Sequence, residues 1–207
     1  MTESQEKLEE FALHYPSLGV GKNTTILRAD ENDHFFFYLE TGAVKMTTTT
    51  KDGRSVVIHV FFPGSFFSLL SLVSEADTYD FTSVIPSTVR KIPKSDLLTF
   101  LKSDSQQLFE LQLRLLKGLH GLANRVTQLA TLSAYEQIMQ LLNYFAKHFS
   151  SSTDEKNISI TITHQEIADW LGLSRENVSL QMKQLERDKK IRIQDHKITL
   201  PELDKKM

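Results

Sequence analysis

The sequence predicts an α+β protein with three successive parts: an N-terminal antiparallel β-roll, a long pairing helix and a C-terminal winged helix-turn-helix. Three observations lead to this prediction. Short β-branched and aromatic runs alternate with turns over residues 24–92, a leucine-rich stripe at helical spacing follows, and two helix caps lie close together after residue 163. We place the boundaries at 1–104 for the roll, 105–132 for the helix and hinge, and 133–207 for the last domain.

The composition is that of a globular protein, with 207 residues, 40% of them hydrophobic and 24% charged. The absence of cysteine excludes disulfides, thiolate zinc sites, cysteine-ligated iron–sulfur clusters and cysteine nucleophiles. Glutamates occupy the N-terminus where a signal peptide needs basic residues, and no stretch approaches the roughly 18 apolar residues of a membrane span. We therefore expect a cytoplasmic protein without membrane contact.

Turn residues divide the predicted roll into strands. Asp52-Gly53 lies between two strand-like runs and is the strongest hairpin signal, because a tight primed turn needs positive φ at its central residues. Gly42 and Gly64 predict two further tight corners. This spacing indicates an antiparallel roll or barrel of about eight strands.

The long helix carries an apolar stripe with spacings of three, four and seven residues, which is typical of a helix that pairs along its length with another helix. The predicted pairing residues are Leu108, Leu111, Leu115, Leu122, Val126 and Leu129. Gly118 and Gly121 interrupt the helix at a cost of about 1 kcal/mol each relative to alanine, which indicates either close approach to a partner or a kink. A helix packed on its own roll remains the alternative.

A new helix cap separates the long helix from the C-terminal domain. Ser133 and Glu136 form the Ser-x-x-Glu pattern of a capping box, so a helix restarts at Ala134. We hypothesise that the hinge around Leu132-Ser133 sets the orientation of the C-terminal domain.

Two short helices follow, joined by a glycine turn. Thr163 and Glu166 repeat the capping box, Gly172 ends the first helix, and Ser174 caps the second. The predicted buried faces are Ile167, Ala168 and Leu171 on the first helix and Val178, Met182 and Leu185 on the second. Two helices joined this tightly form a helix-turn-helix.

An α-helix fits the major groove of B-DNA, and the second helix of this motif enters it. Arg175 can pair with guanine, Glu176 can accept from cytosine, and Lys183 can hold a phosphate. Residues 191–200 predict a hairpin turning at Asp195-His196, a wing beside the helices. The predicted DNA-contacting residues are Thr163, His164, Ser174, Arg175, Glu176, Asn177, Ser179, Leu180, Lys183, Arg192 and Lys197.

Net charge is −2, yet residues 175–197 hold seven basic against four acidic residues, so the basic surplus is local. In this order of parts, and in the stretches "YLETGAVKM", "DGRS" and "THQEIADWLGLSRENVS", the chain resembles the bacterial CRP/FNR transcription regulators. The resemblance implies a cyclic-nucleotide-binding-like roll, a homodimer on a pseudo-palindromic operator in double-stranded DNA, and RNA polymerase as a partner. It assigns base reading to Arg175, Glu176 and Ser179, whereas Leu180 stands where the family usually has a second arginine.

The roll departs from the family's cyclic-nucleotide binders, which place a glutamate after a glycine and an arginine before Ser or Thr. Here Ser65 follows Gly64, and "EADTYDFTS" contains no basic residue, so a buried phosphate would lack its charge partner. We therefore expect an effector other than cyclic AMP, or control without a small molecule. The candidate pocket residues are Gly64, Ser65, Phe66, Thr82 and Ser83.

Other chemistries have weaker support. Haem is chemically feasible through His34, His59 or His120, but lone histidines are usually surface or core residues, so we expect no haem, metal or other cofactor. The aromatic run "HFFFYL" is either a pocket lining or the roll's own core. No glycine-rich phosphate loop, nucleophile elbow or metal-ligand spacing indicates an enzyme. The alternative to a DNA-binding regulator is a sensor whose C-terminal domain binds a protein partner.

Overall fold

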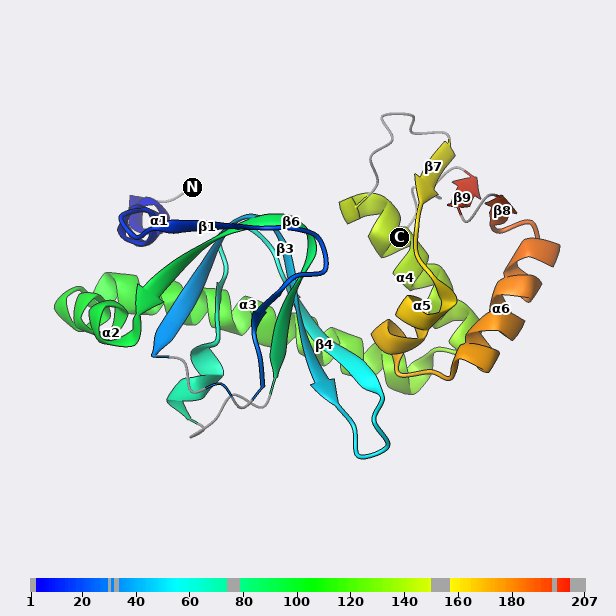
Figure 1. Ribbon diagram of the computed structural model, residues 1–207, viewed down its shortest axis with the longest axis horizontal. Helices are drawn as coiled ribbons and strands as arrows, with labels where there is room; N and C mark the ends of the chain where they lie inside the picture. The colour runs from blue at the N-terminus through cyan, green and yellow to red at the C-terminus, as the bar shows by residue number, and fades with distance from the viewer. Residues whose placement is uncertain are drawn as a thin grey trace. The chain divides into compact units, whose positions relative to one another are not determined.

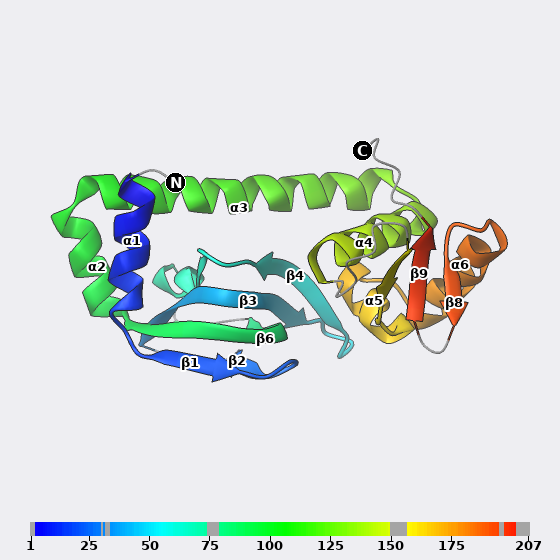
Figure 2. The ribbon, with the colours of Figure 1, turned by 90° about the horizontal axis from the view of Figure 1, so that it is seen from above.

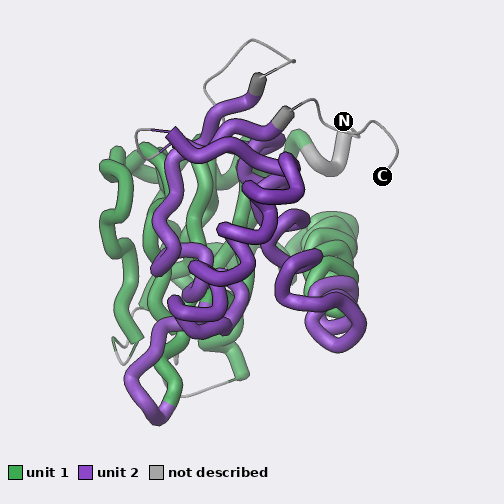
Figure 3. Tube along the Cα trace, turned by 90° about the vertical axis from the view of Figure 1, so that its right-hand side faces the viewer, with its two compact units in different colours: residues 1–50, 57–123 green, residues 51–56, 124–207 purple. Residues whose placement is uncertain are grey.

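The computed structural model describes residues 3–29, 31, 34–73, 79–149, 157–194 and 197–201. The chain divides into two compact units, residues 1–50 with 57–123 and residues 51–56 with 124–207 (Figures 1 and 3). None of the described helices combines the length and the apolar character that a membrane crossing requires.

The first unit contains a six-stranded sheet in which β6 and β3 are the long central strands (Figure 2). The strand order is β1-β6-β3-β4, with β2 paired to β6 and β5 paired to β3. The strands are β1 (Ser17–Val20), β2 (Thr25–Leu27), β3 (Phe35–Thr49), β4 (Ser55–Phe61), β5 (Phe66–Phe67) and β6 (Asp80–Pro93). The sequence predicts about eight strands, whereas the described residues form six here, because β3 and β6 each continue through a bend instead of dividing in two.

Gly42 causes that bend in β3. It lies inside the strand and not at the predicted tight corner, and the register with β6 shifts on both sides of it. Its φ is +91°, and a Cβ there would meet the Ser87 Oγ at 2.2 Å, so only glycine fits. The other two predicted turns are confirmed, since Gly53 and Gly64 have φ of +79° and +89°.

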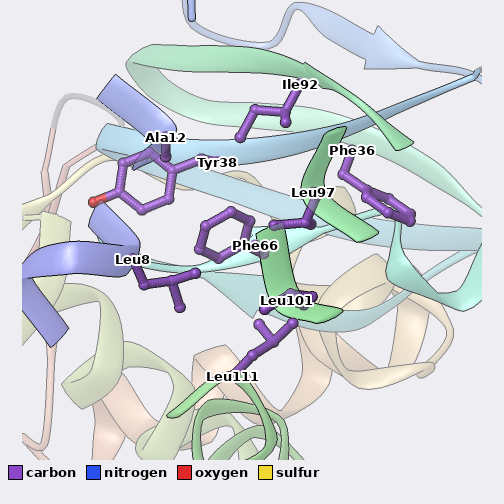
Figure 4. Close-up of a cluster of buried hydrophobic side chains, with 9 residues drawn as sticks. All are labelled: Leu8, Ala12, Phe36, Tyr38, Phe66, Ile92, Leu97, Leu101 and Leu111. Carbon is purple, nitrogen blue, oxygen red and sulfur yellow. The ribbon is translucent and has the colours of Figure 1, made fainter. Parts of the chain in front are cut away.

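The aromatic run of β3 forms the core of the roll on both of its faces. Phe36 and Tyr38 pack in a cluster with the helices α1 (Glu3–Leu13) and α2 (Lys94–Ser103), as Figure 4 shows. Phe37 and Leu39 point to the opposite face, into a second buried cluster. The interpretation of "HFFFYL" as core is therefore confirmed.

The long helix α3 (Ser105–Thr131) has one buried end and a largely exposed apolar stripe. Leu111 is only 6% exposed and packs against α1 and α2 in the same cluster, so its prediction as a pairing residue is wrong. Four other predicted pairing residues are exposed: Leu108 (41%), Leu115 (50%), Val126 (65%) and Leu129 (44%). Leu122 is half-buried. The stripe is wider than predicted, because Phe109, Leu113, Leu116 and Leu119 are exposed as well.

The second unit packs three helices against a small sheet. These elements are α4 (Ala134–Phe149), α5 (His164–Leu171), α6 (Arg175–Arg187), and the antiparallel sheet β7-β9-β8, made of β7 (Asn157–Ile160), β8 (Arg192–Gln194) and β9 (Lys197–Pro201). Its core comes from apolar side chains of every helix, among them Ile138, Leu142, Ile167, Val178, Met182 and Leu185, each fully buried. The predicted two-stranded wing therefore carries a third strand. Its predicted turn at Asp195-His196 lies outside the described residues.

Candidate nucleic-acid interface

Local hydrogen bonds fix where α4 and α5 begin. The Thr163 Oγ1 accepts the Glu166 N–H at 3.1 Å, while the Glu166 carboxylate accepts the Thr163 N–H at 2.7 Å, which completes the predicted capping box. Ser133 and Glu136 make the same exchange at α4, at 3.3 and 2.8 Å. The hydrogen bonds from Ser133 lower the pKa of the Glu136 carboxyl, so this cap is fully charged at neutral pH.

The turn between α5 and α6 is built as the sequence predicts. Gly172 takes the left-handed conformation with φ +69°, and its N–H donates to the Ala168 carbonyl. Ser174 then caps α6, with its Oγ accepting the Asn177 N–H at 3.2 Å. Ile167 and Ala168 are buried as predicted, but Leu171 is only half-buried and Trp170 takes the inner position. The pair is a helix-turn-helix with a buried crossing.

The outer face of α6 presents mixed polar and apolar groups to solvent. The exposed residues are the N-cap Ser174 and, within α6, Arg175, Glu176 and Lys183. Leu180 is 64% exposed. Each residue of a helix is rotated by about 100° from the one before it. Arg175, Glu176, Leu180 and Lys183 of α6 therefore lie, together with Ser179, within an arc of about 140° on the helix surface. A guanidinium, a carboxylate, a hydroxyl, an isobutyl group and an ammonium on one narrow face can engage base edges and phosphates together.

Two predicted contact residues are engaged inside the unit. His164 Nδ1 lies 2.9 Å from the Ser179 Oγ, which joins the first turn of α5 to α6. Partial burial, then the positive charges of Arg175 and Lys183, lower the pKa of the His164 imidazole. Asn177 is half-buried, and its Oδ1 accepts a hydrogen bond from the Gln181 side chain at 3.3 Å.

The wing continues directly from α6. β8 pairs with β9 from Arg192 opposite Thr199 to Gln194 opposite Lys197. The Glu186 carboxylate of α6 accepts a hydrogen bond from the Ile193 N–H at 3.3 Å. This bond joins the first strand of the wing, β8, to α6. Arg192 and Lys197 are exposed on these strands, where their charges can reach a phosphate backbone.

An arginine that the sequence analysis missed holds the end of α3 in this unit. Arg125 donates to the Trp170 carbonyl, in the last turn of α5, where helix carbonyls lack intrahelical partners. Burial lowers the pKa of the Arg125 guanidinium, and the half-buried Tyr144 lies close enough to interact with it electrostatically. Its sequence signal was a basic residue between the stripe residues Leu122 and Val126.

A second missed arginine lies beside the candidate pocket of the roll. Arg114 Nη1 donates to the Gly64 carbonyl at 2.5 Å, and its other nitrogens pair with Glu9 at 3.3 Å and Glu110 at 3.1 Å. The side chains of Arg114 and Glu110 are only 17% and 8% exposed. Gly64, one of the predicted pocket residues, is therefore joined to α3 by a hydrogen bond.

The remaining pocket candidates are engaged in the fold as well. Ser83 is fully buried, its Oγ accepts the Thr24 N–H at 2.8 Å, and it lies 2.5 Å from the Gly21 carbonyl, to which it donates. Phe66 is 5% exposed and packs in the core cluster with Tyr38, and its role as a pocket residue stays a prediction. Ser65 donates its N–H to the Phe62 carbonyl, and Thr82 pairs with Thr25 and Lys45.

The histidines weighed as haem ligands lie on separate elements. His34 precedes β3, His59 lies in β4 against the Phe61 ring, and His120 lies on α3. Within the described part of the chain, no three histidine, aspartate or glutamate side chains come together as a metal site would require.

Comparison with known proteins identifies both units. Residues 19–104 match the family model of the cyclic nucleotide-binding domain, and residues 136–205 match that of the Crp-like helix-turn-helix domain. The cAMP-activated global transcriptional regulator CRP of Pasteurella multocida is 27% identical over 186 residues, covering 86% of this chain and 87% of the relative. The CRP-like protein Clp of Xanthomonas euvesicatoria is 24% identical, covering 87% of this chain and 82% of the relative.

Solved structures show the same fold. The c-di-GMP-responsive global regulator CLP of Xanthomonas campestris superposes with a TM-score of 0.82 at 21% identity, over 96% of this chain and 99% of that one. A CRP-family transcriptional regulator of Thermus thermophilus gives 0.79 at 23% identity, over 90% and 92%. The fold, the helix-turn-helix and the matches to known regulators together define the class of the protein, a DNA-binding transcription regulator. The chain belongs to the CRP/FNR family.

Proposed function

We propose that the protein binds a pseudo-palindromic operator as a homodimer, in the cytoplasm, and acts on transcription there through RNA polymerase, without enzymatic activity of its own. The observation that carries this proposal is the exposed face of α6, where Arg175, Glu176 and Leu180 lie together at the N-terminal end of a recognition helix. In this geometry adjacent half-sites are about 34 Å apart, one turn of DNA.

Each exposed group of α6 has a distinct role in the proposal. Arg175 makes a bidentate contact with a guanine, Glu176 accepts from a cytosine amino group, and Leu180 touches a thymine methyl group. Because Leu180 cannot hydrogen-bond, the operator differs from sites read by an arginine at this position. The positioning contacts to phosphates come from Lys183, Arg192 and Lys197 together with Thr163 and Ser174 at the helix starts.

The dimer forms along α3. Apolar side chains 41–65% exposed, such as Leu108, Leu115 and Val126, recur along one face of a helix of 27 residues. A contiguous apolar stripe of this kind indicates a protein interface, and its heptad-like spacing fits a second copy of the same helix.

Cyclic AMP is not the effector in this proposal. The roll has Ser65 after Gly64, the Gly64 carbonyl is bonded to Arg114, and the hydroxyl of Ser83 is used by Thr24 and Gly21. The segment that follows η1 (Leu69–Leu72) contains no lysine or arginine up to residue 83. It therefore offers no basic side chain to pair with a cyclic phosphate bound in the roll. Since one relative is named as cAMP-activated and one neighbour as c-di-GMP-responsive, both nucleotides are the first ligands to test.

Coupling between the units runs along α3. The sequence suggests a hinge around Leu132-Ser133, yet the residues from Asn124 onward cluster with the second unit, and Arg125 anchors them to α5. We therefore place the joint at Gly118 and Gly121, where an added Cβ would meet nothing within 4 Å.

Exchanging both glycines for alanine tests this joint, because each exchange favours the helix by about 1 kcal/mol without a clash. If they form the joint, operator affinity changes together with the rise in thermal stability, whereas Gln128→Ala, an exposed control on the same helix, leaves affinity unchanged. Unaltered affinity in the double variant would place the joint elsewhere.

A footprint of the full-length protein on genomic DNA, followed by affinity measurements at several salt concentrations, tests the function. A symmetrical footprint and an affinity that falls steeply with salt support DNA reading, since phosphate contacts release counterions. Absence of any footprint, together with a salt-independent affinity for a protein captured from cell extract, would favour the sensor with a protein partner.

A further inference from the structure

The hydrogen bond between His164 and Ser179 lies at the face that we assign to base reading. His164 is the first residue of α5, and Ser179 lies fifteen residues later in the second turn of α6. Both side chains are half-buried, and the Nδ1···Oγ distance is 2.9 Å. On the helix surface, Ser179 lies between Arg175 and Lys183, the two cations that also act on His164.

A serine hydroxyl by itself does not discriminate among base edges. It has one hydrogen to donate and two lone pairs that accept, and it rotates to suit its neighbour. In the major groove it can donate to guanine O6 or N7, adenine N7 or thymine O4, and it can accept from adenine N6 or cytosine N4. A fixed partner that takes the hydrogen leaves only lone pairs for a base, whereas a partner that donates to one lone pair leaves the hydrogen to be placed on another acceptor.

His164 is such a partner, and its protonation decides which of these two arrangements forms. When Nδ1 carries a hydrogen, it donates to the Ser179 Oγ, so the hydroxyl keeps its own hydrogen for a base. When Nδ1 carries none, Ser179 donates to it, and only lone pairs remain for the base. Neutral imidazole allows both arrangements, whereas imidazolium carries a hydrogen on each nitrogen and allows only the first.

The surroundings keep His164 neutral at neutral pH. Partial burial is the largest cause of its lowered pKa, and the facing charges of Arg175 and Lys183 on α6 act in the same direction. The imidazole therefore gains its proton only below about pH 6.5, the ordinary histidine value. Lowering the pH through that range removes His164 as an acceptor, so the hydroxyl hydrogen of Ser179 must be donated elsewhere, and an accepting base edge becomes the favoured partner.

We propose that His164 is a positioning residue that sets which base edge Ser179 reads, so that acidification shifts the preference at that base pair toward edges that accept a hydrogen bond. The proposal rests on the proposed entry of α6 into the major groove. A hydrogen bond of ordinary net strength, 0.5–1.5 kcal/mol, corresponds to a change of roughly 2- to 12-fold in relative affinity.

The test is a competition measurement with the full-length protein on the footprinted operator and its single-base variants, at about pH 5.8 and pH 7.5 and at one ionic strength. For wild type we expect one symmetrical pair of positions at which the preference for guanine or thymine over cytosine rises at least twofold at the lower pH. The variants His164→Gln and Ser179→Ala lose this pH effect, while His34→Gln, at an exposed histidine of the roll, retains it.

Circular dichroism and thermal melting of each variant show that the fold is kept, and His164→Phe provides a second variant that cannot bond to Ser179. Base preferences that change equally with pH in wild type and in Ser179→Ala would overturn the role of His164. A footprint without any pH-dependent position would do the same and leave the proposed function intact. Equal binding to all DNA sequences at both pH values would instead overturn the proposed function.

Discussion

The outer face of α6 and the segments around Gly64 and Ser83 in the roll use their polar groups in opposite ways. On α6 the guanidinium of Arg175 and the carboxylate of Glu176 extend into solvent. In the roll, the carbonyl of Gly64 accepts from Arg114, and the hydroxyl of the fully buried Ser83 bonds to backbone groups of the chain before β2. Polar groups satisfied inside the chain stabilise the fold, whereas exposed ones can bind another molecule.

Removal of Arg114 should have the largest effect. In Arg114→Met, the carboxylate of Glu110, 8% exposed, loses its cation, and the Gly64 carbonyl loses its donor. We expect a loss of about 3 kcal/mol in the free energy of unfolding, because a buried charge left without its partner is costly. Urea unfolding at one fixed protein concentration measures it, and Arg175→Met is the matched exposed control, with an expected change below about 0.5 kcal/mol. Equal losses in both variants would erase the contrast between the regions.

Arg175→Ala tests whether the exposed face of α6 reads DNA. We expect operator affinity to fall by about 1–3 kcal/mol, with discrimination relaxed at one base pair and thermal stability unchanged. Lys183→Ala is the matched control, since loss of a phosphate contact weakens binding to all sequences and lowers the salt slope by about 1. Uniform weakening in Arg175→Ala would make this residue a phosphate contact.

Ser83→Ala should affect stability and leave DNA reading unchanged. It removes the acceptor of the Thr24 N–H and a donor to the Gly21 carbonyl in a fully buried position. We expect a loss of about 2 kcal/mol in the free energy of unfolding, the cost of leaving buried polar groups unsatisfied. A variant with unchanged stability and altered ligand response would show that this hydroxyl serves a ligand after all.

The smallest expected effect concerns the effector. Cyclic AMP should leave the melting temperature unchanged, whereas a ligand at one hundred times its Kd stabilises a protein by about 2.7 kcal/mol. Thermal melting with and without the nucleotide measures this, and a cAMP-activated relative serves as the positive control. A clear upward shift would mean that the roll binds the phosphate without the expected arginine.

Features that depend on neighbours three or four residues away were predictable from the sequence. The capping boxes at Thr163 and Ser133, the cap at Ser174 and the left-handed Gly172 all form as expected, because each capping atom meets a backbone group within one helical turn. The exposed face of α6 follows from the same periodicity. The base-reading, dimer and pocket roles of the candidate residues remain predictions.

Features that depend on distant partners were not predictable in this way. Leu111 fits the leucine stripe by spacing, but α1 and α2 cover it. The strand count was overestimated because a chain that bends at Gly42 opposite Ser87 resembles two strands in sequence. His164 was chosen as a DNA contact, while its bond to Ser179 required the packing of α5 on α6.

The helix-turn-helix near the end of the chain and its mixed polar face follow from local sequence alone, since helix starts, helix ends and amphipathic faces are set by contacts within a turn or two. The hydrogen-bond partners of the arginines of α3, by contrast, depend on how the whole chain folds. Arg114 meets Gly64 at a separation of 50 residues, and Arg125 meets Trp170 at a separation of 45. A guanidinium donates hydrogen bonds to any carbonyl or carboxylate that the folded chain brings close to it. Its partner therefore cannot be predicted from residue spacing within one element.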